Sequence, residues 1–310
     1  MIRKDYYERM SGISRFCFVF LLLGLALNAV SQATSNSAVT EGYTTTASGV
    51  RIHYLQSGPE SSKNAIILIP GWRLPAYLWD EQLKKLGREH RVIAIDPRSQ
   101  GASSKTADGN TPETRAKDLS EIMTNLKITQ AVLVGWSQGA QDVAAYVAQF
   151  GTDSLAGVVF VDSPVSIGAA EVELHPQFSK AIISMMPIYA NYPKEYSDRM
   201  VRGLFKKPPA DAEVQKIVQF TLQTPTDTGL SMLVTDIFGA DRRAALTKLN
   251  KPALVVASAE SNLLDAQKEM AKVIPGAKFV PIDGAAHAVF VDQPEKFDGV
   301  LEDFLRSLPR

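Results

Sequence analysis

The stretch that decides the fold is AVLVGWSQGAQDVAAYV, residues 131–147. Its first four residues form a continuous apolar run, which is typical of a strand buried on both faces of a parallel sheet. GWSQG, residues 135–139, follows without a break and has the pattern G-x-S-x-G. The apolar residues after it return at helical spacing as far as residue 147. The stretch therefore predicts a strand, a tight turn that holds up the hydroxyl of Ser137, and a helix.

Glycines on both sides of Ser137 support this interpretation. A sharp strand-to-helix turn leaves no room for side chains around its central residue, so Gly135 and Gly139 suit it sterically. The turn also brings the amides after the serine to a helix N-terminus. We interpret Ser137 as a nucleophile, and the alternative is a glycine-rich turn that carries a solvated serine.

Further apolar runs on either side of this stretch predict a sheet. Four of them have the same continuous character and comprise residues 65–69, 92–95, 157–161 and 253–256. A last run at residues 279–282 contains Pro281, which favours an edge position. Residues 42–56 alternate about a turn and predict a hairpin at a sheet edge. Because helical patterns separate the runs, we expect the α/β class, with a mostly parallel central sheet flanked by helices.

The alternation of strands and helices stops between Pro164 and Leu249. This segment has apolar residues at helical spacing and no strand pattern, and it is too long for a simple crossover. We expect a helical cap at about residues 165–249, inserted before the penultimate strand and covering the carboxyl edge of the sheet. Most of its apolar side chains should pack on the core, while a few, with Met185 or Met186 among them, should line an apolar substrate mouth.

The first 33 residues have the pattern of an export signal. Basic residues up to Arg15 precede an apolar run at residues 16–27, and small residues follow as far as Ala33. The run is shorter than the roughly 20 residues that a membrane span needs. We expect cleavage after Ala33, a linker at residues 34–40 and the α/β domain at residues 41–310, in a periplasmic or extracellular protein. An uncleaved N-terminal anchor and a buried helix are the alternatives.

The composition excludes several classes of protein. Lys+Arg and Asp+Glu both total 33 in 310 residues, so no basic field is available to hold nucleic acid. The one cysteine, Cys17, lies inside the predicted signal, which leaves the exported chain without a thiol nucleophile or a disulfide. The sequence has no HExxH motif, phosphate-binding loop, GxGxxG after a strand or Cys/His cluster. We therefore expect a small-molecule substrate, no metal and no organic cofactor.

A serine hydroxyl needs a base to take its proton, and the chain has four histidines. His53 falls in the edge hairpin, His90 precedes a strand at its amino end, and His175 lies in the predicted cap. His287 follows the last predicted strand, at the carboxyl edge where the turn of Ser137 also emerges. Its position predicts that His287 is the general base.

From about residue 48 to its C-terminus the sequence resembles the α/β-hydrolase family. The resemblance is carried by IPGW, DPRSQGAS, GWSQG, FVDSP and the loop around His287, which lie at residues 69–72, 96–103, 135–139, 160–164 and 284–294. These motifs are specific to the fold and to triad chemistry, but not to a substrate. The resemblance implies that the backbone N–H groups of Trp72 and Gln138 form an oxyanion hole.

Two positions depart from the family's pattern. Pro70 stands where histidine is frequent, and the hole can survive because the donor is expected two residues further on, at Trp72. Ser99 stands where glycine is usual, and we expect a structural effect only.

The triad acid has two candidate positions. The family's usual position, past the strand at residues 253–256, falls here at Ser261, which cannot carry the charge. Its neighbour Glu260 could reach with its extra methylene. The exit of the preceding strand, where some relatives carry the acid, places Asp162 close to the turn of Ser137. We predict Asp162, with Glu260 as the alternative, and Asp265 or no acid as the remaining possibilities.

The residue at position 137 narrows the chemistry. A dehalogenase or an epoxide hydrolase of this fold would need aspartate there, so Ser137 implies acyl transfer. We expect hydrolysis of a small, fairly apolar ester through an acyl-enzyme. The same residues could pass the acyl group to peroxide, as a perhydrolase or cofactor-free haloperoxidase does, or to an alcohol, as an acyltransferase does. A more distant alternative is a non-catalytic binding protein on the same fold.

Overall fold

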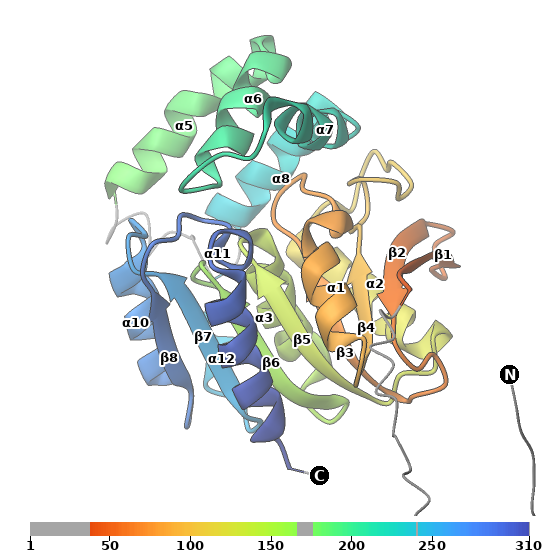
Figure 1. Ribbon diagram of the computed structural model, residues 1–310. Coiled ribbons are helices and arrows are strands. Elements are labelled where there is room, and N and C mark those ends of the chain that lie inside the picture. Colours follow the sequence, from red (N-terminus) through yellow and green to blue (C-terminus); the bar gives the residue numbers. More distant parts are fainter. Residues whose placement is uncertain (1–37, 166–175, 240, 310) are drawn as a thin grey trace, which may run out of the picture. The chain divides into compact units, whose positions relative to one another are not determined.

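The computed structural model describes residues 38–165, 176–239 and 241–309 of the chain (Figure 1). The predicted export signal and most of the predicted linker lie outside these residues, so export stays a prediction. The last linker residue, Thr40, differs from the expectation. It is the first residue of strand β1 (Thr40–Thr45), where it pairs with Gln56, because the edge ladder extends one residue beyond the predicted domain boundary.

Eight strands form one sheet in the order β1-β2-β4-β3-β5-β6-β7-β8. The remaining strands are β2 (Arg51–Ser57), β3 (Asn64–Ile69), β4 (Arg91–Ile95), β5 (Gln130–Trp136), β6 (Leu155–Val161), β7 (Ala253–Ser258) and β8 (Lys278–Ile282). β2 pairs antiparallel with β1 and with β4, and every other pairing in the sheet is parallel. The predicted mostly parallel sheet with an N-terminal edge hairpin is therefore confirmed, and Pro281 lies in the other edge strand, β8.

The order of strands around β3 determines where a ligand can bind. The chain passes from β3 to β4 on one side and then returns to place β5 on the other side of β3. Ligands of open α/β sheets bind outside the carboxyl ends of the strands at such a switch point. Ile69 at the end of β3 pairs with Gly135 of β5, so the turn that carries Ser137 emerges at this point.

Successive side chains of the central strands enter two separate cores, one on each face of the sheet. Ile67 and Ile69 pack with residues of α2 (Pro112–Asn125), α3 (Gln138–Phe150) and α10 (Leu264–Val273). Ile66 and Leu68 pack with residues of α1 (Asp80–Leu86) and α12 (Pro294–Arg306). Burial on both faces explains why these strands are continuous apolar runs rather than alternating ones.

Helices fill the chain between β6 and β7, and no strand occurs there among the residues that the structure describes. They are α5 (Pro176–Asn191), α6 (Pro193–Gly203), α7 (Asp211–Thr221), α8 (Thr226–Phe238) and α9 (Arg243–Leu246). α5 to α8 gather at one end of the sheet, as a cap should (Figure 1). Leu246 of α9 and the following Leu249 pack into the core with residues of α3 and α10. No helix in the described ranges is long and apolar enough to cross a membrane.

Candidate active site

Ser137 lies in a strained bend between β5 and α3. Its backbone has φ 55° and ψ −119°, a conformation that non-glycine residues rarely adopt. A Cβ on Gly135 would overlap the carbonyl oxygen of Gly139, and a Cβ on Gly139 would lie 2.6 Å from the carbonyl oxygen of Ile69. Both glycines are therefore required by backbone contacts, and the bend holds the serine side chain half-buried at the carboxyl edge of the sheet.

The loop after β3 packs directly against the serine side chain. A Cβ on Gly71 would lie 3.0 Å from the Cβ and 3.4 Å from the Oγ of Ser137. Trp72 is the next residue of that loop. Gln138 is the first residue of α3, and the first amides of a helix have no acceptor within the helix. The two amides expected to form an oxyanion hole thus belong to the two backbone segments that adjoin Ser137.

His287 and Asp162 form a hydrogen-bonded pair beside this bend. The Nδ1 atom of His287 lies 2.7 Å from Oδ2 of Asp162, and the imidazole remains one-third exposed. A carboxylate can only accept, so this bond places a proton on Nδ1 and leaves Nε2 able to accept one. The carbonyl oxygen of His287 accepts a 2.9 Å hydrogen bond from the indole of Trp136, the residue that precedes Ser137.

Asp162 is held rigidly by the ends of β6 and β7. It follows β6 directly at φ 46°, and its backbone N–H donates to the carbonyl of Val256 at 2.8 Å. Its Oδ1 atom accepts from the backbone N–H of Ser258 at 3.0 Å and from Nε2 of Gln267 at 3.2 Å. The side chain is buried, and with Oδ1 held by these two donors its Oδ2 faces His287.

The other two candidate acids point elsewhere. The carboxylate of Glu260 is half-exposed and forms an ion pair with Lys206. Asp265 is exposed and lies 3.3 Å from the ammonium group of Lys268. The structure therefore brings Asp162, and neither of the alternatives, into hydrogen-bonding contact with His287.

An aromatic cluster fixes the His287 loop against the end of β5. The ring of Phe290, three residues after His287, stacks on Trp79 with centroids 3.7 Å apart and meets Trp136 edge-on at 4.9 Å. All three rings are buried. Pairs of this kind contribute about 0.5–1.5 kcal/mol beyond the burial of their area. The cluster joins the residue before Ser137 to the loop that carries the imidazole.

The other histidines lie away from this pair. His53, in β2, is buried with its Nδ1 atom 2.8 Å from Oδ2 of Asp96. Asp96 also accepts from the backbone N–H groups of Ala76 and Ala102, so this second His–Asp pair ties loops together. His90 lies at the amino end of β4, as expected. His175 lies outside the described residues.

The departure at Ser99 is accommodated locally. Its φ of 63° lies in the left-handed region that favours glycine, which agrees with the family's usual residue there. Its Oγ accepts a 2.9 Å hydrogen bond from the backbone N–H of Thr106. The substitution thus has the structural effect that we expected from the sequence.

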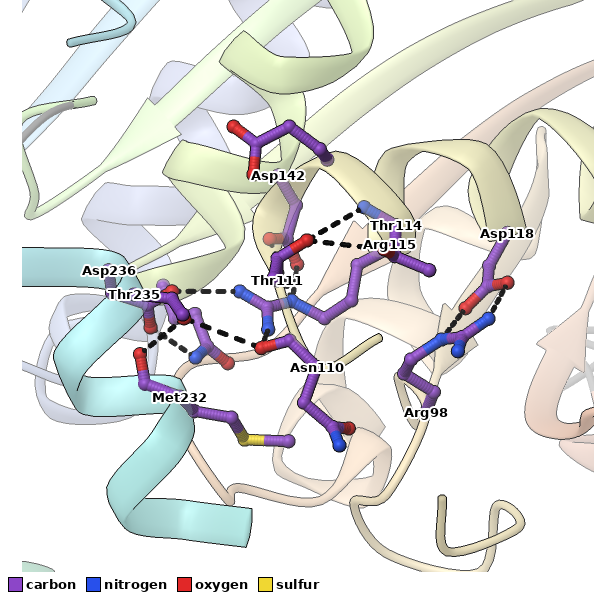
Figure 2. Close-up of polar contacts among 12 residues, drawn as sticks. Arg98, Asn110, Thr111, Thr114, Arg115, Asp118, Asp142, Met232, Thr235 and Asp236 are labelled. Atoms are coloured by element: carbon purple, nitrogen blue, oxygen red, sulfur yellow. Dashed lines mark hydrogen bonds and ion pairs between the residues drawn. The ribbon is translucent and has the colours of Figure 1, made fainter. Parts of the chain in front are cut away.

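Two buried groups of ion pairs involve helix α2, and neither was predicted from the sequence (Figure 2). The guanidinium of Arg115, on α2, lies 2.9 Å from Asp142 of α3 and 3.1 Å from Asp236 of the cap helix α8. Arg98 pairs with Asp118 through two bonds of 2.6 Å. Arg115, Asp118, Asp142 and Asp236 are charges among apolar residues at helical spacing, and this pattern does not identify their partners.

Two carboxylates share one guanidinium in the first group. Burial raises the pKa of Asp142 to about 7, and the negative charge of Asp236 adds to that rise while Arg115 opposes it. Burial likewise raises the pKa of Asp236. Burial of the two carboxylates therefore favours uptake of a proton, while the charges of Arg115 and Arg242 oppose it. Within the described ranges, no group of three or more His, Cys, Asp or Glu side chains is arranged to hold a metal ion.

The fold and this geometry define a class of protein. The family model described as "Alpha/beta hydrolase family" matches residues 66–299, which is more than half of the chain. The protein belongs to that family, and it is an enzyme.

Curated relatives of known name cover most of the chain. A "Bifunctional esterase/perhydrolase" from Acinetobacter calcoaceticus is 26% identical over 86% of this chain and 100% of its own length. A "Non-heme chloroperoxidase" from Kitasatospora aureofaciens is 28% identical over 85% of this chain and 98% of its own.

Solved structures with the same fold are also similar. A bromoperoxidase from Bacillus anthracis superposes with a TM-score of 0.77 at 24% identity, covering 86% of this chain and 100% of its own. An esterase from Exiguobacterium antarcticum superposes with a TM-score of 0.76 at 18% identity, covering 86% of this chain and 99% of its own. At these identities the likeness shows the fold alone.

The raised pKa of Asp142 makes the stability of the protein depend on pH. In the folded chain the group takes up a proton near pH 7, against an ordinary value of 3.8. Its contribution to stability is therefore fully present below about pH 4 and is lost as pH rises through about 7. The Asp142→Asn variant has no carboxyl group at this position, so it should not lose this stability as the pH rises. The free energy of unfolding of the variant minus that of wild type should thus increase by about 1–3 kcal/mol from pH 5 to pH 8.

Urea unfolding at the two pH values measures this difference. Asp303→Asn, which changes an exposed carboxylate on α12, is the matched control and should differ from wild type by the same amount at both. A pH-independent difference for Asp142→Asn would contradict the expected proton uptake.

Proposed function

We propose that the protein is a serine hydrolase that cleaves a small, fairly apolar ester, with Ser137 as nucleophile, His287 as general base and Asp162 as the triad acid. The observation that carries the proposal is the 2.7 Å hydrogen bond between His287 and Asp162, beside the strained bend that holds Ser137. The names of the esterase and perhydrolase relatives support the reaction class.

The proposed reaction begins with transfer of the Ser137 hydroxyl proton to Nε2 of His287. The serine oxygen then bonds to the ester carbonyl carbon, and the carbonyl electron pair moves onto its oxygen. Asp162 holds the imidazole in the required tautomer and stabilises the imidazolium that forms. Collapse of the intermediate breaks the bond to the alcohol, which takes the proton from His287. Water then repeats the sequence on the acyl-enzyme and releases the acid.

The backbone amides of Trp72 and Gln138 are the proposed donors to the developing oxyanion. Gly71, the residue before Trp72, lies against the serine side chain, and Gln138 follows the serine directly. Both donors are backbone N–H groups. In hydrolases one such donor contributes about 10²–10³ in kcat, because it is oriented before the charge develops.

Contacts between the cap and Trp72 support the proposal that the substrate is apolar. The indole of Trp72 meets the rings of Tyr189 and Tyr196 edge-on, with centroids 5.3 and 6.2 Å apart, so an aromatic wall adjoins the proposed oxyanion loop. Met185 is half-buried, and its sulfur accepts from the hydroxyl of Tyr196 at 3.9 Å. These contacts favour Met185 over its neighbour as a lining residue of the proposed mouth.

A second candidate function follows from the relatives. The printed names of the Acinetobacter and Kitasatospora proteins include perhydrolase and chloroperoxidase. In that case the same acyl-enzyme passes its acyl group to hydrogen peroxide and yields a peracid. The two functions share every step up to the acyl-enzyme and differ only in the acceptor.

Ser137→Ala tests the nucleophile for both functions. Because no other group can form the acyl-enzyme, hydrolysis of p-nitrophenyl esters should fall at least about 1,000-fold, and a fluorophosphonate probe should no longer label the protein. Acid and peracid formed in the presence of peroxide should fall together, and their ratio in wild type identifies the acceptor. Ser307→Ala, at the end of α12, should behave as wild type. Labelling that persists in Ser137→Ala would exclude the assignment.

Asp162→Asn and Glu260→Gln test the acid. An asparagine can donate to Nδ1 and so leave the imidazole in the wrong tautomer, which costs about 10⁴ in kcat in a comparable triad. We expect Asp162→Asn to lower kcat by about 10³–10⁴ with little change in KM. Glu260→Gln, which loses only a half-exposed ion pair with Lys206, should retain wild-type kcat. The reverse pattern would assign the acid to Glu260.

A further inference from the structure

One helix of the cap contacts the side chains of both residues whose amides are the proposed oxyanion donors. The indole N–H of Trp72 donates to the carbonyl oxygen of Gly229 at 3.0 Å. The side-chain amide of Gln138 donates to Oδ2 of Asp236. Gly229 and Asp236 both lie on α8 and are seven residues apart, which is two helical turns and therefore one face of the helix.

α8 packs closely against its neighbours at Gly229, its contact with Trp72. A Cβ on Gly229 would overlap the hydroxyl of Tyr189 and would lie 3.0 Å from the Cδ of Arg73. The guanidinium of Arg73 lies 4.0 Å from the ring centroid of Trp72 and 4.2 Å from that of Tyr189. Trp72 is therefore held on its N–H edge by α8 and on its ring face by a buried cation.

The second contact, between Gln138 and Asp236, is also held by further polar interactions. Oδ1 of Asp236 lies 3.1 Å from Arg115, so the carboxylate that holds Gln138 is itself fixed to α2 (Figure 2). The Oε1 atom of Gln138 accepts a 3.1 Å bond from Gln100. Both ends of the Gln138 side-chain amide are thus bonded, and the side chain is buried.

We propose that α8 sets the geometry of the oxyanion hole, with Gly229 and Asp236 as positioning residues that act through the side chains of Trp72 and Gln138. The inference rests on the proposed function. Each side chain is one Cα away from the amide that it orients, so loss of its bond frees the corresponding peptide plane to turn. Misplacement of a catalytic group by about 1 Å can cost about 10²-fold in rate.

This arrangement also explains why buried polar groups are retained between cap and core. A satisfied buried network specifies a single arrangement of the elements that it joins. Here it joins α8, α2 and α3 at the point where the turn of Ser137 ends. The cap would therefore contribute to the chemical step as well as to substrate binding.

Two variants test the side-chain hydrogen bonds without removing the backbone amides. Gln138→Met and Trp72→Phe each remove a donor to α8 while keeping the backbone N–H and most of the bulk. We expect kcat for p-nitrophenyl ester hydrolysis to fall about tenfold in each, with KM changed less than twofold. The inhibition constant of an aryl boronic acid, which forms a tetrahedral adduct on serine, should weaken by a similar factor.

Thr152→Val is the matched control. Thr152 is also buried, and its hydroxyl donates to Oδ1 of Asn250 at 2.6 Å, but it precedes β6 at the amino end of the strand, away from Trp72 and Gln138. It should keep wild-type kcat. If one test variant does not fold, as judged by its urea unfolding, the other decides alone, because the two contacts lie on different loops.

The outcomes are distinct. Unchanged kcat in both folded variants, a rise confined to KM, or an equal loss in Thr152→Val would overturn the role of α8 and leave the proposed function standing. Wild-type protein that neither hydrolyses the esters nor reacts with the fluorophosphonate probe would overturn both.

Discussion

The candidate site depends on a bend at Ser137 that an ordinary backbone avoids. The serine has a positive φ because β5 must pass into α3 within one residue, and the two glycines beside it admit backbone contacts that no Cβ could tolerate. Such strain persists only where the surrounding structure holds the residue in place. Here the surroundings are the parallel neighbours of β5, whose ends hold the loop of Gly71 on one side and Asp162 on the other.

A second strained residue completes the arrangement. Asp162 also has a positive φ, at the end of the adjacent strand, and its backbone is bonded to β7. Parallel pairing therefore brings the serine and the carboxylate to the same edge without a long loop. His287 comes from a longer loop, and it is fixed by the buried aromatic cluster and by the indole bond from Trp136. The rigidity of the site thus comes from the sheet and its core.

The sequence predicted the sheet well because strands buried on both faces leave continuous apolar runs. It predicted the two glycines beside Ser137, because the steric demand of the turn is local to residues 135–139. It favoured Asp162 but did not exclude Glu260, since both follow strands that end at the same edge. Only the direction of each side chain separates them, and that direction depends on partners such as Gln267 and Lys206 far along the chain.

Other features had no sequence signal at all. The bond between Gln138 and Asp236 joins residues 98 positions apart, and neither hydrophobic periodicity nor a motif marks such a pair. Contacts of this kind are decided by packing between elements, which a single sequence does not record.

A crystal structure of the protein after reaction with a fluorophosphonate would show the nucleophile, the imidazole and the oxyanion donors together. We expect a phosphorus atom bonded to Oγ of Ser137, a phosphonyl oxygen within hydrogen-bonding distance of the amides of Trp72 and Gln138, and His287 still bonded to Asp162 with Nε2 toward the adduct. An adduct on a different residue, or an imidazole turned away from the bonded serine, would contradict the proposed triad.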